Sequence, residues 1–143
     1  MSPIRVVVDT NVMVSGLLWK GKSHNLIKLA EENQITFCVC TEMLEELDEV
    51  LRREKFGKRI KALSTSVEQL MFLVETLVEI IDVKGVFPYM TTDTDDNVFL
   101  SCAQNSKVKY VISGDEHLLI LGCLEEISII SVSDFFEREG LGF

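Results

Sequence analysis

Short apolar runs alternate along the chain with segments of helical periodicity, and this alternation limits the available folds more than any other feature. The strand-like runs are Ile4–Val8, Ile35–Cys40, Tyr110–Ile112 and Ile127–Ile130, with Val78–Val83 as a further candidate. Helical patterns cover Ser23–Glu32, Thr41–Arg53, Val67–Leu77 and Asp95–Asn105. Continuous apolar strands are typical of parallel sheets that helices cover on both faces. The sequence therefore predicts an α/β fold with three layers, α/β/α, around a central, mainly parallel sheet.

Length and composition narrow the class of protein. A chain of 143 residues suits one domain, 1–143, and a hydrophobic fraction of 47% with 26% charged residues favours a globular core over disorder. The net charge of −9 is not typical of a basic nucleic-acid binder. No apolar run approaches the roughly 18 residues of a membrane span, so we expect no membrane association. The four cysteines, which form no CxxC pair, are interpreted as reduced core thiols of a cytoplasmic protein: Cys38, Cys40, Cys102 and Cys123.

Acidic residues follow the predicted strands or open the next helix. Asp9 comes directly after Ile4–Val8, and Asp115 lies three residues beyond Tyr110–Ile112. A third group stands just before an apolar helical pattern: Asp93, Asp95 and Asp96. In open α/β sheets this edge, at the carboxyl ends of the strands, is where ligands bind.

These aspartates have two interpretations. Each one alone is best explained as a helix N-cap, because Asp is a favoured capping residue. Taken together, several carboxylates at one sheet edge would repel one another unless a cation lies among them. Carboxylate oxygens are hard ligands, so the group predicts a site for Mg²⁺ or Mn²⁺.

A fourth acid is expected from the helix Thr41–Arg53. With 100° per residue and Leu47 at the centre of the apolar stripe, Glu45 falls on the solvated face. Glu46 and Asp48 flank the stripe on opposite sides, at about −100° and +100°. Periodicity does not choose between these two acids.

One basic segment interrupts the acidic background. Six cations fall within ten residues, opposed only by Glu54: Arg52, Arg53, Lys55, Lys58, Arg59 and Lys61. The segment carries +5, so the rest of the chain carries −14. It is either a solvated helix end or a surface that binds phosphates, and the two interpretations weigh about equally.

Four short motifs, in order, resemble those of PIN-domain proteins. They are Val6-Val7-Val8-Asp9-Thr10-Asn11-Val12-Met13-Val14-Ser15, Leu44-Glu45-Glu46-Leu47, Asp96-Asn97-Val98-Phe99-Leu100-Ser101-Cys102-Ala103 and Tyr110-Val111-Ile112-Ser113-Gly114-Asp115. Each motif is weak alone, but their order and spacing agree from Val6 to about Phe136. Lys55-Phe56 and the cluster at 93–96 further resemble a subgroup described as toxin components of toxin–antitoxin systems.

This resemblance implies a metal-dependent ribonuclease that hydrolyses RNA phosphodiester bonds. Four residues would surround Mg²⁺ or Mn²⁺ and form the catalytic site: Asp9, Glu46, Asp96 and Asp115. Auxiliary roles would fall to Thr10, Asn11, Ser113, Asp93 and Asp95, and the basic segment would bind RNA. The resemblance also implies a homodimer or higher oligomer and a small antitoxin protein as partner.

The chain departs from the family pattern at one position, and two other functions remain as alternatives. The fourth motif of many toxins reads Thr-Arg/Asn-Asp, whereas this chain has Gly114 between Ser113 and Asp115, so one side chain is lost there. A metal-dependent phosphatase acting on small phosphates would share the acidic edge but would not need the basic segment. A non-catalytic RNA- or protein-binding module with a degenerate site is the third interpretation.

Overall fold

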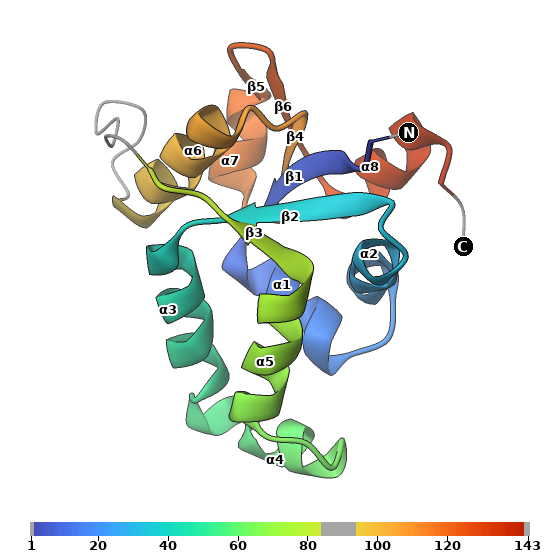
Figure 1. The fold of residues 1–143 in the computed structure, drawn as a ribbon, viewed down its shortest axis with the longest axis vertical. Helices are drawn as coiled ribbons and strands as arrows, with labels where there is room; N and C mark the ends of the chain where they lie inside the picture. The colour runs from blue at the N-terminus through green and yellow to red at the C-terminus, as the bar shows by residue number, and fades with distance from the viewer. Residues whose placement is uncertain (1, 84–93, 142–143) are drawn as a thin grey trace.

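The computed structural model describes residues 2–83 and 94–141, and at 94–97 it describes the backbone alone. Within these residues six strands form one sheet in the order β3-β2-β1-β4-β6-β5 (Figure 1). Their bounds are β1 (Ile4–Val8), β2 (Ile35–Val39), β3 (Val78–Ile80), β4 (Tyr110–Ile112), β5 (Cys123–Leu124) and β6 (Ile127–Ile130). All neighbours pair in parallel except β5 and β6. The mainly parallel sheet is confirmed, with β3 shorter than expected and β5 not predicted.

Eight helices occur in the described part of the chain, and none of them is both long and apolar enough to cross a membrane. Four match predicted segments: α2 (Lys22–Glu31), α3 (Thr41–Leu51), α5 (Val67–Leu77) and α6 (Thr94–Ser106). Four were not predicted: α1 (Thr10–Leu18), α4 (Glu54–Ala62), α7 (Glu116–Leu121) and α8 (Val132–Glu139). The basic segment is therefore not the end of the preceding helix: it covers the turn after α3 and most of α4.

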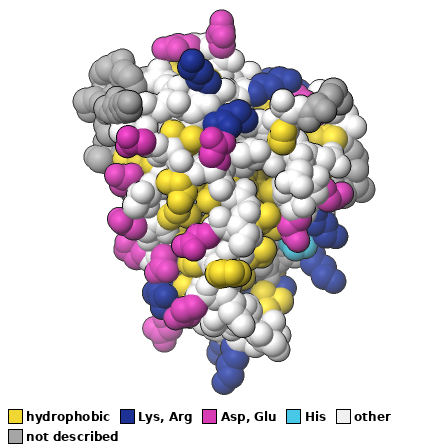
Figure 2. All heavy atoms as spheres, viewed as in Figure 1, with side chains coloured by type: hydrophobic (Ala, Val, Ile, Leu, Met, Phe, Trp, Pro, Cys, Tyr) yellow, Lys and Arg dark blue, Asp and Glu magenta, His cyan; other side chains and the backbone are white. Residues whose placement is uncertain are grey.

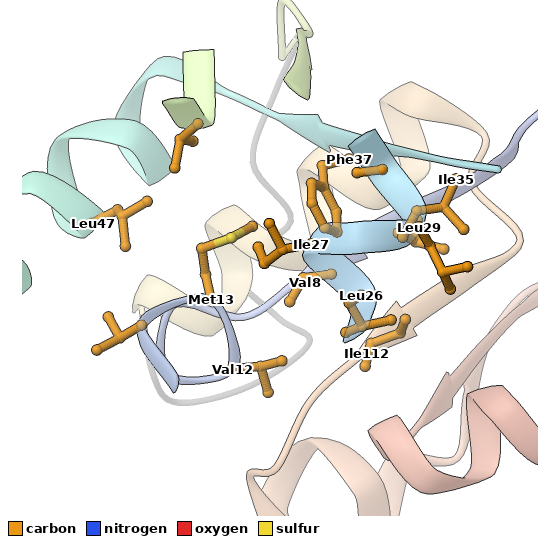
Figure 3. Close-up of a cluster of buried hydrophobic side chains, with 14 of the residues drawn as sticks. Val8, Val12, Met13, Leu26, Ile27, Leu29, Ile35, Phe37, Leu47 and Ile112 are labelled. Carbon is orange, nitrogen blue, oxygen red and sulfur yellow. The ribbon is translucent and has the colours of Figure 1, made fainter. Parts of the chain in front are cut away.

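Helices cover both faces of the sheet, as the three-layer prediction requires. Val6, Val8 and Ile112 point into a buried cluster with α1, α2, α3, α5 and α8. Val7 and Val111 point to the opposite face, where they pack with α6 and α7. Figure 3 shows part of the first cluster, in which side chains of α1, α2 and α3 converge on β1, β2 and β4. Strands buried on both faces explain the continuous apolar runs.

The close packing of α1 against α2 depends on Gly16. A Cβ at this position would lie 2.6 Å from the carbonyl oxygen of Ser23, which is too close for any larger residue. His24 of α2 adds a hydrogen bond at the same place, because its Nδ1 lies 2.9 Å from the backbone oxygen of Gly16. The first turn of α2 is thereby held against the second half of α1.

The cysteines correct one expectation. Cys38, Cys40 and Cys102 are buried free thiols, as predicted. Cys123 is also free but exposed, so it is not a core residue. The reason is its place on β5, a two-residue strand at the outer edge of the sheet.

Candidate active site

The carboxyl ends of β1 and β4 form a topological switch point. The chain leaves β1 toward β2 on one side, and it leaves β4 toward β6 on the other. Val8 is paired with Ile112, so the residues that follow these strands, Asp9 and Ser113, emerge side by side. The backbone N–H of Asp9 extends the pairing by donating to the Ile112 oxygen at 3.0 Å. Diverging connections at such a point leave space for a ligand.

Asp9 is a buried carboxylate whose two oxygens have different partners. Its side chain is 6% exposed. Oδ1 accepts a hydrogen bond from the backbone N–H of Val12 at 2.8 Å and so caps α1. Oδ2 accepts from the hydroxyl of Ser113 and from the backbone N–H of Gly114, the latter at 3.2 Å. Capping is therefore real, but it occupies only one of the two oxygens.

Ser113 connects Asp9 to Asp115. Its side chain is fully buried, and its hydroxyl accepts the backbone N–H of Asp115 at 3.0 Å while it donates to Asp9. Asp115 is half-buried and caps α7, because its Oδ1 accepts the backbone N–H of His117 at 2.8 Å. The structure thus brings Asp9, Ser113 and Asp115 into one hydrogen-bonded unit at the switch point.

Gly114, the departure from the toxin motif, is exposed and lies in open space. Among the described residues, no heavy atom beyond its chain neighbours lies within 4 Å of the place where a Cβ would be. A larger side chain would fit here without moving its surroundings. Packing against the described residues thus does not impose the glycine beside Asp115.

The structure shows which flank of α3 faces α5, and so how Glu46 and Asp48 are oriented. Asp48 and Glu45 line a groove of about 480 Å³ between α3 and α5, together with Met71 and Glu75. The Asp48 side of α3 therefore faces α5. Glu46 lies about 200° around the helix from Asp48, on the side turned away from α5, and it is half-buried. Helix α3 also packs against α1, the helix that Asp9 caps, and the choice of Glu46 over Asp48 as the catalytic acid stays a prediction.

The acidic cluster at 93–96 is only partly described. Asp93 lies outside the described residues, and Asp95 and Asp96 belong to the first turn of α6, where only the backbone is described. Figure 1 shows that this end of α6 lies at the side of the sheet to which β2 points, which is the carboxyl edge. Among the described residues no three acidic, histidine or cysteine side chains gather closely enough to hold a metal ion.

The auxiliary residues of the first motif follow Asp9 in α1. Thr10 is the first residue of this helix and is half-buried, whereas Asn11 is exposed. Neither side chain takes part in the hydrogen-bonded unit formed by Asp9, Ser113 and Asp115 as far as the described contacts go.

The basic segment lies at the far end of α3 from the sheet. Figure 2 shows Lys and Arg side chains at the lower tip of the molecule, where Figure 1 places α4, and Asp and Glu side chains along the side formed by α3. Two of its cations have partners within the fold. Arg52 donates to Asp48 Oδ1 at 2.7 Å, which raises the pKa of the guanidinium, and Arg59 donates to the Leu18 oxygen at 2.6 Å. Five of the six cations have exposed side chains, namely Arg52, Arg53, Lys55, Lys58 and Lys61, whereas Arg59 is half-buried.

The fold and the paired aspartates define an α/β protein with a candidate site at the carboxyl ends of β1 and β4. The family model of the PIN domain matches residues 5–117, and the chain belongs to this family, whose members are generally nucleases.

Among solved structures the chain is similar to VapBC2 from Rickettsia felis, determined bound to a DNA fragment from their promoter. The match has a TM-score of 0.62 and 13% sequence identity, and it covers 90% of this chain and 98% of the other. At this identity it confirms the fold. No curated protein sequence matches the chain.

Proposed function

We propose that this PIN-domain protein is a divalent-metal-dependent ribonuclease that hydrolyses RNA phosphodiester bonds and acts as the toxin of a toxin–antitoxin pair. The observation that carries the proposal is the unit of Asp9, Ser113 and Asp115 at the switch point. It holds two carboxylates from different strands at one edge of the sheet. Glu46 and Asp96 complete the catalytic set, on the order and spacing of the four motifs.

The chemistry of the described donors fits a hard cation. A carboxylate offers about four lone-pair positions, and among the described residues three donors occupy those of Asp9: Val12, Ser113 and Gly114. The described contacts of Asp9 thus leave one position for a metal ion, and Asp115 Oδ1 accepts one described hydrogen bond. Carboxylate oxygens suit Mg²⁺ and Mn²⁺, which the resemblance also implies.

In this proposal the side chains of the site position the metal ion and form no covalent bond with the RNA. When bound, the ion supplies an activated water and stabilises charge on the leaving oxygen of the phosphodiester. Hydrogen bonds from Ser113 and Gly114 hold Oδ2 of Asp9 in one orientation. Asp115 is held by its cap on α7. No covalent nucleophile is needed, because the attacking group is water.

The partner and the oligomer belong to the same proposal. The related fold of VapBC2, a toxin–antitoxin complex, supports a small antitoxin protein as partner. The sequence resemblance adds a homodimer or higher oligomer in the cytoplasm. RNA would be attracted by the exposed lysines of α4, which offset the repulsion of a chain with net charge −9.

The test is cleavage of RNA by the purified protein with Mn²⁺, with EDTA and with Asp115→Asn in parallel. We expect cleavage that EDTA and the substitution both abolish. Hydrolysis of a small phosphomonoester without RNA cleavage would favour the phosphatase. RNA binding without any hydrolysis would favour a non-catalytic module.

A further inference from the structure

A tryptophan lies at the end of α1 that is opposite to Asp9. Trp19 is the only tryptophan of the chain, and 43% of it is exposed although it is a large aromatic residue. It forms the C-cap of α1 and meets Phe56 of α4 edge-on, with ring centroids 6.2 Å apart. The aromatic pair therefore joins two helices that are distant in sequence; Trp19 is open to solvent, whereas Phe56 is partly buried against the core.

Cations surround this aromatic pair. The guanidinium of Arg59 lies 5.7 Å from the centroid of the Trp19 ring, and its Nε donates to the Leu18 oxygen at 2.6 Å. The ammonium of Lys55 lies 5.1 Å from the centroid of Phe56. These contacts fix α4 against the end of α1 and keep two positive charges beside the exposed ring of Trp19 and the partly buried ring of Phe56.

Helix α1 sets the distance between this surface and Asp9. Asp9 is its N-cap and Trp19 its C-cap, so the two residues mark its ends. At a rise of 1.5 Å per residue they are separated by about 15 Å. That length corresponds to a few nucleotides of a strand, so one RNA molecule could contact both ends.

We propose that Trp19 and Phe56, with Lys55 and Arg59, form a nucleobase-binding subsite that holds an unpaired base a few nucleotides from the bond cleaved at Asp9. An exposed aromatic ring provides a stacking surface for any base, and flanking cations bind the adjacent phosphates. The charge of the surface favours a nucleic acid, because Lys55, Phe56 and Arg59 lie in the +5 segment of a chain whose remainder is −14. The inference rests on the proposed ribonuclease activity for its substrate.

The single tryptophan makes the subsite directly measurable. Wild-type protein in EDTA is titrated with a single-stranded RNA octanucleotide, and binding is followed both by Trp19 fluorescence and by an independent label on the RNA. We expect stacking to quench Trp19. Trp19→Ala should weaken binding about 10-fold, within the range that one base stack contributes, and Trp19→Phe should restore most of the affinity.

Phe72→Ala is the matched control, because Phe72 is 70% exposed on α5 and outside the basic segment. It should leave the affinity unchanged. RNA binding without a change in Trp19 fluorescence would overturn the subsite, as would equal losses in Trp19→Ala and Phe72→Ala. Occupation of Trp19 by a protein partner, with no quenching by RNA, would also overturn it. Quenching without cleavage under Mn²⁺ would retain the subsite and refute the nuclease, whereas cleavage without quenching would do the reverse.

Discussion

Ser113 donates the hydrogen bond that holds Oδ2 of Asp9, although the two residues are 104 positions apart in the sequence. The same hydroxyl accepts the backbone N–H of Asp115. One buried side chain therefore sets the relative positions of the two aspartates that the structure brings together. This gives Ser113 a positioning role that its place in the motif alone did not define.

Replacing Ser113 by Ala should weaken metal binding without removing a carboxylate. The change leaves Oδ2 of Asp9 with the Gly114 N–H alone, so Asp9 gains freedom. We expect a loss of about 2 kcal/mol in the free energy of unfolding, typical of a hydrogen bond to a charged group, and weaker Mn²⁺ binding by calorimetry. Ser131→Ala, which removes a cap of α8, should lower stability by about 1 kcal/mol without changing Mn²⁺ affinity.

The two aspartates should respond differently to Asn. Asp115→Asn keeps an oxygen for the His117 N–H, so stability should be unchanged. In Asp9→Asn the single amide oxygen can serve either the cap of α1 or the Ser113 side, and the amide N–H₂ then faces a donor. We expect both variants to lose Mn²⁺ binding and cleavage. Only Asp9→Asn should lower the free energy of unfolding measured in urea, by about 1–3 kcal/mol. Equal stability losses in the two variants would contradict this difference.

Glu46→Gln should reduce cleavage strongly, whereas Asp48→Asn and Glu45→Gln should have little effect on it. The reason is that Asp48 and Glu45 line the groove toward α5, on the other side of α3. The measurement is the rate of RNA cleavage at saturating Mn²⁺ for the three variants. A loss confined to Asp48→Asn would show that the catalytic acid lies on the α5 side.

The cations of the basic segment should contribute unequally to RNA binding. Lys58 is exposed on α4, whereas Arg52 is engaged by Asp48 and Glu68. Lys58→Gln should weaken RNA affinity and reduce the slope of its logarithm against log salt by about one. Arg52→Gln should leave the slope unchanged, because its charge is already paired. The check is RNA affinity at several salt concentrations, and an unchanged slope in both variants would identify the segment as a solvated surface only.

Stability should fall in acid partly through Glu139. Hydrogen bonds from Tyr110 and then Lys109 hold the pKa of this carboxyl below its ordinary value of 4.5. A lowered pKa in the folded state means that the stabilisation is complete above about pH 4.5 and is lost as the pH falls through the folded-state pKa. Glu139→Gln should therefore be less stable than wild type in urea at pH 7, and the difference should shrink toward pH 3. A difference that is the same at both pH values would contradict the assignment.

Particular elements show why some features were predictable and others were not. The strands β1, β4 and β6 are buried on both faces, so they carry the unbroken apolar runs that mark parallel strands. Helix α1 was missed, because its sequence from Val12 to Leu18 is as apolar as a strand. Its helical form depends on the Asp9 cap and on the close contact with α2 at Gly16, and that contact is tertiary.

In the candidate site, too, some features follow from the local sequence and others depend on tertiary structure. The local pattern determined that Asp9 and Asp115 end up at the carboxyl edge, because each follows a strand and caps the next helix. Periodicity placed Glu46 and Asp48 on the flanks of α3 but could not orient them, since orientation depends on which neighbour packs on which flank. The groove puts Asp48 on the flank that faces α5, and the catalytic role of Glu46 stays a prediction. The bond from Ser113 to Asp9 and the meeting of Trp19 with Phe56 join residues far apart in the chain. Such pairs exist only once strand order and helix packing have been set, and no local pattern encodes them.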